Sequence, residues 1–159
     1  MALSKKKNNE SKNMHFSRED QKKILSSSSP FIVKEAYSSI RTNLLFSQKG
    51  DECPVFIVTS PTANNGKSIN SVNMAVSFAQ MGKKTLLIDA DMRNPTVHRL
   101  FSIPVKNGLS EILAGLTDNI TVSKTDIENL SVLTAGKIPP NPSELLSSER
   151  TDKLLAFVK

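Results

Sequence analysis

The 159 residues carry 21 Lys and Arg against 15 Asp and Glu, a formal net charge of +6, and 38% of them are hydrophobic. This length suits one domain that can bury a core, and the scarcity of aromatic residues makes that core aliphatic. A single cysteine excludes an internal disulfide framework, and no apolar run reaches the length of a membrane span.

The first 29 residues are typical of a basic, disordered tail and linker. Residues 1–23 hold seven Lys or Arg against three acids, and no apolar stretch follows that would make a secretory signal. Two interpretations stay open, a solvated tail or a contact with anionic lipid. The Lys5-Lys6-Lys7 run lacks interleaved aromatics, so we expect no nucleic-acid partner.

Residues 31 to about 47 predict a helix, because apolar side chains recur at positions 32, 36, 40 and 44. The pattern alone favours a helix that packs on the core and leaves Glu35 and Arg41 in solvent. After a turn, the apolar run Val55-Phe56-Ile57-Val58-Thr59 predicts a short buried strand.

The next stretch, residues 60–68, ends in Gly66-Lys67-Ser68 and leads into a helix expected from about residue 66 to near Gly82. A strand that leads into a helix N-terminus directs free N–H groups and the positive dipole end toward one point, where anions bind readily. This context indicates a phosphate-binding P-loop, in which Lys67 would reach the outer phosphates and the Ser68 hydroxyl would ligate magnesium. The candidate nucleotide-binding residues are Thr62, Ala63, Asn64, Asn65, Gly66, Lys67, Ser68 and Ile69.

The P-loop pattern departs from its usual form at the first glycine, where this chain has Pro61. Asn64 and Asn65 compensate in part, because Asn tolerates the left-handed backbone conformation better than most residues. The competing interpretation is a surface turn that happens to contain Gly-Lys-Ser.

A second predicted strand, residues 84–88, ends in Asp89-Ala90-Asp91-Met92-Arg93. Ligands of open α/β sheets lie outside the carboxyl ends of strands, so these side chains should lie at the same edge as the P-loop. Asp89 and Asp91 could hold magnesium or accept a proton from a hydroxyl nucleophile, and Arg93 could bind a phosphate. The competing interpretation is a solvated turn.

The rest of the chain alternates helices and strands. Short helices are expected from Asn94 to Leu100 and from Leu109 to Leu113, a third strand at residues 130–134, and a helix from about Ser143 after a Pro-rich loop. This alternation predicts an α/β fold with a parallel sheet flanked by helices.

The two motifs together resemble those of the bacterial tyrosine kinases that use a P-loop ATPase fold. That family carries a Walker A loop and then a Walker A′ motif of three apolar residues followed by Asp-x-Asp-x-Arg, which residues 86–93 match at every defined position. Residues 136–146 are similar to the family's Gly-x-x-Pro-Pro-Asn-Pro-x-Glu-Leu-Leu segment, and residues 35–43 to its oligomerisation helix.

The resemblance implies that the chain binds ATP and Mg²⁺ and phosphorylates protein tyrosines, including its own, in the regulation of capsule or exopolysaccharide synthesis. It implies catalytic roles for Lys67, Asp89, Asp91 and Arg93, and magnesium ligands at Ser68 and Asp89. It places Glu35 and Arg41 at an oligomer interface. It further implies a cytoplasmic chain held at the inner face of the membrane by a membrane-anchored activator protein.

Several departures from the family pattern shape these expectations. The interface motif has Ser38 in place of its first Arg. The Walker A loop has Ala63-Asn64-Asn65 in place of the usual Pro-Gly-Glu or Pro-Gly-Ala, and this second change is expected to affect the affinity for nucleotide. Residues 30–159 are therefore expected to be the N-terminal portion of a P-loop kinase domain that is incomplete at its C-terminus. The Walker B strand and the tyrosine cluster would lie beyond it, and Tyr37 is the only tyrosine present.

Two further functions remain as alternatives. One is an inactive, truncated nucleotide-binding regulatory subunit, since kinase activity should be reduced without those elements. The other is a partition-type or septum-type switch ATPase. That class has a lysine where this chain has Thr62, so the sequence favours it less.

Overall fold

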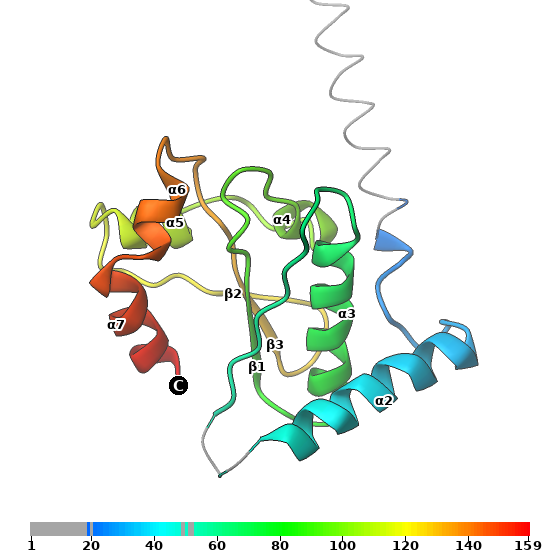
Figure 1. Ribbon diagram of the computed structural model, residues 1–159. Helices are drawn as coiled ribbons and strands as arrows, with labels where there is room; N and C mark the ends of the chain where they lie inside the picture. Colours follow the sequence, from blue (N-terminus) through cyan, green and yellow to red (C-terminus); the bar gives the residue numbers. More distant parts are fainter. Residues whose placement is uncertain (1–18, 20, 49, 51–52) are drawn as a thin grey trace, which may run out of the picture.

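The computed structural model describes residue 19 and residues 21–48, 50 and 53–159 (Figure 1). Within them a small sheet lies beside α3, with α2 at one side and α5, α6 and α7 at the other. The helices are α2 (Phe31–Ser47), α3 (Lys67–Gln80), α4 (Val97–Leu100), α5 (Leu109–Leu113), α6 (Pro142–Leu146) and α7 (Glu149–Val158), and the strands are β1 (Thr85–Ile88), β2 (Ser123–Lys124) and β3 (Leu130–Leu133). None of the helices described there is both long enough and apolar enough to cross a bilayer.

The sheet confirms the predicted α/β class. β1 runs parallel to β3, with Leu87 opposite Val132, so the two longest strands end at the same edge. β2 pairs antiparallel with the other side of β3, giving the order β1-β3-β2. The sequence did not predict β2, because a strand of two residues is too short to show an alternating pattern.

The apolar face of α3 holds the sheet in place. Val72, Val76 and Ala79 are buried, as their helical spacing predicted, and they pack in one cluster with Leu130 and Val132 of β3. A second cluster joins the end of the sheet to α5 and α7; its buried members are Met92, Leu109, Ile112, Leu113, Leu133, Ala135 and Leu154. The helix that carries the P-loop lysine is therefore fixed directly to the sheet.

Helix α2 has the bounds that the sequence predicted, but a different face of it packs. None of its residues is buried, and Ile32 and Ile40 are 77% and 46% exposed. Arg41, expected in solvent, instead turns inward and donates hydrogen bonds to Ser77 O (2.8 Å) and Ser77 Oγ (2.9 Å) on α3. A long polar side chain that satisfies buried acceptors can turn a helix away from the face that its apolar residues favour.

The predicted buried strand at residues 55–59 is wrong. This segment belongs to no sheet among the described residues, and Ile57 is 87% exposed. Only Phe56 packs closely, with its ring 5.6 Å from that of Phe78 on α3. β propensity makes a strand only where a neighbouring strand accepts its hydrogen bonds, and none of the three strands in the described part of the chain lies beside this segment.

The folded part of the chain begins before the boundary expected at residue 30. Leu25 is 4% exposed and belongs to the α3 cluster, and Gln21 Nε2 donates to Arg99 O (3.2 Å) and Ser102 Oγ (2.9 Å). Gln21 and Leu25 are therefore packed on the domain, although the expected linker includes both residues. The rest of the expected tail, residues 1–18 and 20, lies outside the described residues.

Candidate nucleotide-binding site

The loop before α3 contains two residues with left-handed backbone. Gly66, the residue that begins α3, has φ +75°, and Asn64 has φ +60°. Asn65 Nδ2 donates to Thr62 Oγ1 (2.7 Å), and Ser60 Oγ donates to Thr62 O (2.7 Å). Left-handed backbone at Asn64 is the compensation that the sequence suggested for the missing first glycine.

The first turn of α3 provides the donors of the site. Lys67, Ser68 and Ile69 are half-buried and follow Gly66 directly, while residues 62–65 are exposed. The N–H groups of a first turn have no partners within the helix, and α3 has no acid there to neutralise them. This end of α3 is therefore suited to an anion.

Two carboxylates lie at the end of β1. Asp89 is 5% exposed, and it accepts backbone hydrogen bonds from Asp91 N (3.2 Å), Thr96 N (3.3 Å) and Val97 N (3.1 Å). Asp91 accepts from Asn94 N at 3.0 Å, so its own turn holds it. A carboxylate has about four lone-pair sites, so the three recorded donors leave Asp89 capacity for another ligand.

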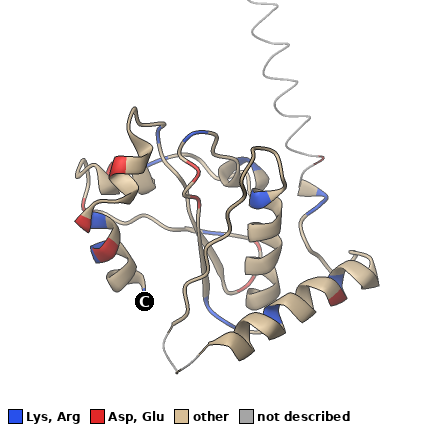
Figure 2. Ribbon diagram, in the orientation of Figure 1, with Lys and Arg blue, Asp and Glu red and all other residues tan. Residues whose placement is uncertain are grey.

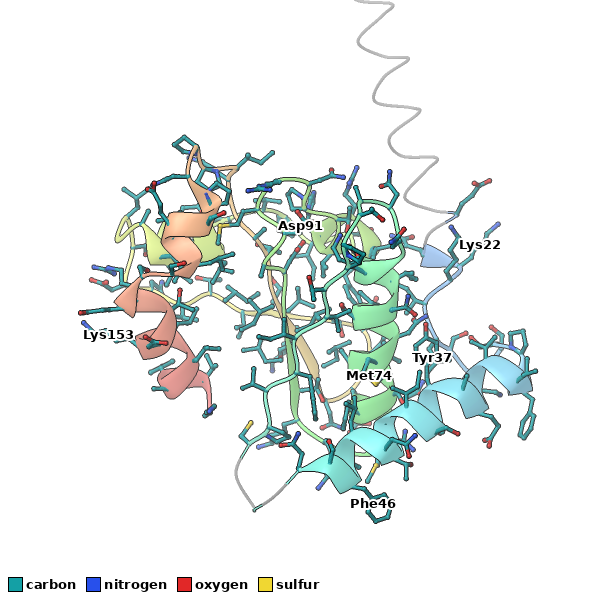
Figure 3. All side chains as sticks on the ribbon, in the orientation of Figure 1. Lys22, Tyr37, Phe46, Met74, Asp91 and Lys153 are labelled. Atoms are coloured by element: carbon teal, nitrogen blue, oxygen red, sulfur yellow. The ribbon has the colours of Figure 1, made fainter. Side chains whose placement is uncertain are left out.

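The P-loop and the acids meet at one edge of the sheet. Lys67 Nζ lies 3.9 Å from Asp91 Oδ2, and the two side chains are 28% and 31% exposed, respectively. In Figure 2 the acidic stretch after β1 lies at the same end of the sheet as the basic residue that opens α3, and Asp91 is labelled in this region in Figure 3. Lys67 and Asp91 thus lie side by side, and Asp89 is joined to Asp91 by the hydrogen bond from Asp91 N. Their roles in a nucleotide site remain a prediction.

Arg93 lies slightly apart from this cluster. It is exposed, and its Nη2 contacts Ser143 Oγ on α6 at 3.4 Å, a long hydrogen bond. That contact places the Pro-rich loop before α6 beside the Walker A′ turn. Pro142 is the first residue of α6, and the fixed φ of proline favours the start of a helix.

Burial raises the pKa of Asp89 above its usual value, because removal from water disfavours the charged carboxylate. Hydrogen bonds from the N–H groups of Val97, Asp91 and Thr96 favour the charged form and lower the pKa, but their effect is smaller. The charge of Asp91 adds to the increase. A carboxyl with a raised pKa is better suited to accept a proton near neutral pH than an ordinary aspartate.

This shift predicts how the stability of the protein depends on pH. Below the usual pKa of about 3.9, Asp89 is protonated in both the folded and unfolded states and its ionisation costs nothing. As the pH rises toward the higher folded-state value, ionisation costs more in the folded state, so wild type loses stability relative to Asp89→Asn. The difference in Tm, variant minus wild type, should therefore increase as the pH rises from about 3.5 toward the raised pKa of folded Asp89 and level off above it, in thermal unfolding followed by circular dichroism. A difference independent of pH would contradict the raised pKa.

The two residues expected at an oligomer interface lie on different sides of α2. Glu35 is exposed, whereas Arg41 is held against α3 by Ser77. The interface itself remains a prediction.

Two residues that shape the site were not predicted. Glu111 of α5 is buried and accepts from Gly108 N (3.1 Å) and Lys137 N (3.2 Å), which fixes the loop after β3. Its signal was a Glu at the third position of a short predicted helix. Asn70 of α3 donates through Nδ2 to Gly66 O at 3.0 Å, and nothing in the sequence pattern distinguished it from a solvated polar residue.

The sequence matches the model of the AAA domain family over residues 62–155. It is 41% identical to the tyrosine-protein kinase YwqD of Bacillus subtilis over 131 residues, covering 81% of this chain and 55% of that protein. Among solved structures it is similar to the BceF tyrosine kinase domain, with a TM-score of 0.75, 40% identity and coverage of 85% of this chain and 55% of that one. The kinase domain of Escherichia coli ETK gives a TM-score of 0.72, 36% identity and coverage of 79% and 49%.

The chain spans about half the length of two curated relatives that it matches, 52% of one and 55% of the other. The matched region contains both the P-loop turn and the Asp89–Arg93 segment described above. The chain therefore belongs to the AAA domain family, in the group that contains the bacterial tyrosine kinases.

Proposed function

We propose that this chain binds Mg·ATP at the edge where α3 begins and β1 ends, and that it forms part of a protein tyrosine kinase that regulates capsular or exopolysaccharide synthesis and export. The observation that carries this proposal is the approach of Lys67 Nζ to Asp91 Oδ2, 3.9 Å apart. A P-loop lysine beside the acids of a neighbouring strand is the arrangement that a metal–triphosphate complex needs.

The residues present fit this ligand. The first-turn N–H groups of α3 and the Lys67 ammonium face the side from which an anion would approach, while Ser68 and Asp89 offer oxygens to a cation. Within the described residues no three His, Cys, Asp or Glu side chains form a metal cluster of their own. Magnesium bound together with nucleotide needs only one or two protein ligands, because the phosphates supply others.

Each residue then has a role in phosphoryl transfer. ATP supplies the phosphoryl group, and Mg²⁺ neutralises charge on the phosphates when both are bound. Lys67 balances negative charge at the outer phosphates, and Arg93 offers a second cation for a phosphate at the rim. Asp89 accepts the proton of the attacking tyrosine hydroxyl, and Asp91, whose N–H donates to Asp89 Oδ1, holds Lys67 in place.

The partners follow from the relatives by analogy. The names of the matched proteins describe tyrosine-protein kinases, and we infer protein tyrosine substrates, self-association through α2, and a membrane-anchored activator that holds the chain at the inner face of the membrane. The exposed residues Ile32 and Phe46 of α2 supply apolar surface for such contacts.

The test has two stages. Calorimetric titration of the purified chain with Mg·ATP should show binding, and Asp89→Asn should weaken its dependence on magnesium. Phosphotyrosine blotting after co-expression with a membrane activator should then show transfer in wild type and none with Asp89→Asn. Binding without transfer would support a nucleotide-binding regulatory subunit instead, and nucleotide-dependent dimerisation without transfer would support a switch ATPase. Absence of binding would refute the proposal.

A further inference from the structure

The hydroxyl of Tyr37 lies between the exposed helix α2 and the helix that carries the P-loop. It donates a hydrogen bond to Asn70 Oδ1 (2.8 Å) and accepts one from Asn73 Nδ2 (3.2 Å), both on α3. In Figure 3, Tyr37 projects from α2 toward α3. The helix α2 has no buried residue, so this half-buried ring and the inward Arg41 are prominent among its connections to the domain.

The partners of Asn73 determine which group donates and which accepts in each hydrogen bond around the Tyr37 hydroxyl. Asn73 is 3% exposed, and its Oδ1 accepts from Leu25 N (2.7 Å), which forces its Nδ2 toward Lys23 O and the tyrosine. A phenol has one proton, so a hydroxyl that accepts from Asn73 gives that proton to Asn70 Oδ1. The Asn70 amide is then oriented with its Nδ2 toward Gly66 O, at 3.0 Å.

Gly66 is the residue through which this orientation reaches the P-loop. It is in the left-handed conformation, and it connects the loop to the first turn of α3. The Asn70 amide lies so close that a Cβ built on Gly66 would be 3.2 Å from Nδ2. The Asn70 side chain therefore supports the peptide that sets the direction of the loop's N–H groups.

We propose that Tyr37 is a positioning residue for the P-loop. It acts through Asn70 on Gly66, so that the placement of α2 on the domain sets the affinity of the loop for nucleotide phosphates. This proposal rests on the nucleotide-binding function proposed above. It differs from an interface role of α2, because the tyrosine faces α3 and not the exposed side of the helix.

The test removes one oxygen atom. Tyr37→Phe keeps the ring but leaves Asn73 with an unmet donor and Asn70 free to rotate, so the affinity for Mg·ATP should fall by about 3- to 10-fold in calorimetric titration of the full chain. The matched control is Thr42→Val, which also removes a hydroxyl from α2; that hydroxyl is exposed and donates only to Ser38 O of its own helix, at 2.9 Å. The control should bind like wild type.

A double-mutant cycle separates positioning from general destabilisation. An Asn70→Ala background lacks the side-chain bond to Gly66 O and keeps only the backbone bond from the N–H of residue 70 (2.9 Å). In that background Tyr37→Phe should no longer change the affinity for Mg·ATP, although it should still lower Tm through Asn73. An equal loss of affinity in both backgrounds would overturn the proposal. So would unchanged affinity in Tyr37→Phe when wild type binds normally.

Two further measurements keep the proposal distinct from the proposed function. Without nucleotide, amide hydrogen exchange at residues 64–69 should be faster in Tyr37→Phe than in Thr42→Val. If wild type failed to bind Mg·ATP and exchange still responded, the function would be refuted and the coupling supported. Because the chain has one tyrosine and no tryptophan, its fluorescence comes from Tyr37 and should change when Mg·ATP is titrated. A constant signal despite binding would contradict the coupling.

Discussion

Replacing Lys67 with Met is expected to lower the affinity for Mg·ATP by about 10- to 100-fold, because a hydrogen bond to a charged group contributes about 1.5–3 kcal/mol. Methionine keeps much of the length of the side chain and its apolar stem, so the change isolates the ammonium group. The ion pair between Lys67 and Asp91 spans 3.9 Å, and both side chains are partly exposed. Pairs of this kind stabilise a fold by only about 0–1 kcal/mol. The variant should therefore stay folded, with a Tm close to that of wild type.

Titration calorimetry measures this loss, and Lys84→Met is its control. Lys84 is an exposed lysine just before β1, and its replacement removes the same charge from the chain without touching the loop. A comparable loss in both variants would mean that net charge, not the P-loop lysine, attracts the nucleotide. Raising the ionic strength should shrink the general charge effect more than the contribution of Lys67.

The proximity of the Gly66-Lys67-Ser68 turn to the acids after β1 was more predictable from the sequence than its surroundings, because two separate signals indicated the same place. The Gly66-Lys67-Ser68 turn needed a helix after it, and the apolar spacing of α3 supplied one whose Val72 and Val76 are indeed buried. The acids after β1 were placed at the same edge by the rule that parallel strands end together. Local chemistry and topology therefore agreed, and the distance between Lys67 and Asp91 is consistent with both.

The errors arose where structure depends on a partner distant in sequence. The apolar run at residues 55–59 has strong β propensity, yet its state depends on whether another strand lies beside it. The packed face of α2 depends on Arg41 reaching Ser77, 36 residues away in sequence, which an apolar pattern cannot show. The packing of Leu25 likewise depends on Asn73, a polar residue buried far along the chain. Such contacts require knowledge of the fold before they can be inferred.

Gly136→Ala should strongly destabilise the loop that follows β3, close to the site. Gly136 has φ +83°, and a Cβ there would overlap Glu111 Oε2 and lie 2.5 Å from Ser110 Oγ. A Glu side chain at the surface could move aside, but this one is buried and accepts from Gly108 N and Lys137 N. Moving it would leave those donors unpaired, at about 1–3 kcal/mol each, in addition to about 1–2 kcal/mol for alanine in the left-handed conformation.

Gly82→Ala is a close control for this prediction. Gly82 has φ +82°, nearly the same as Gly136, but a Cβ there meets nothing within 4 Å. It should therefore cost only the backbone contribution of about 1–2 kcal/mol. The free energies of unfolding of the two variants, measured in urea, should differ by about 2–6 kcal/mol, the part that comes from displacing the side chains of Glu111 and Ser110. Equal losses would show that the carboxylate moves without cost.

A double substitution tests the cause of the loss directly. Glu111→Ala alone should destabilise the protein, because the N–H groups of Gly108 and Lys137 lose their acceptor. Once that side chain is gone, adding Gly136→Ala should cost less than it costs in wild type, since only the contact with Ser110 Oγ and the backbone contribution remain. The loop that Glu111 holds leads to Ser143, which contacts Arg93 at the rim of the site. Mg·ATP binding should therefore weaken along with stability in Gly136→Ala, and remain unchanged in Gly82→Ala.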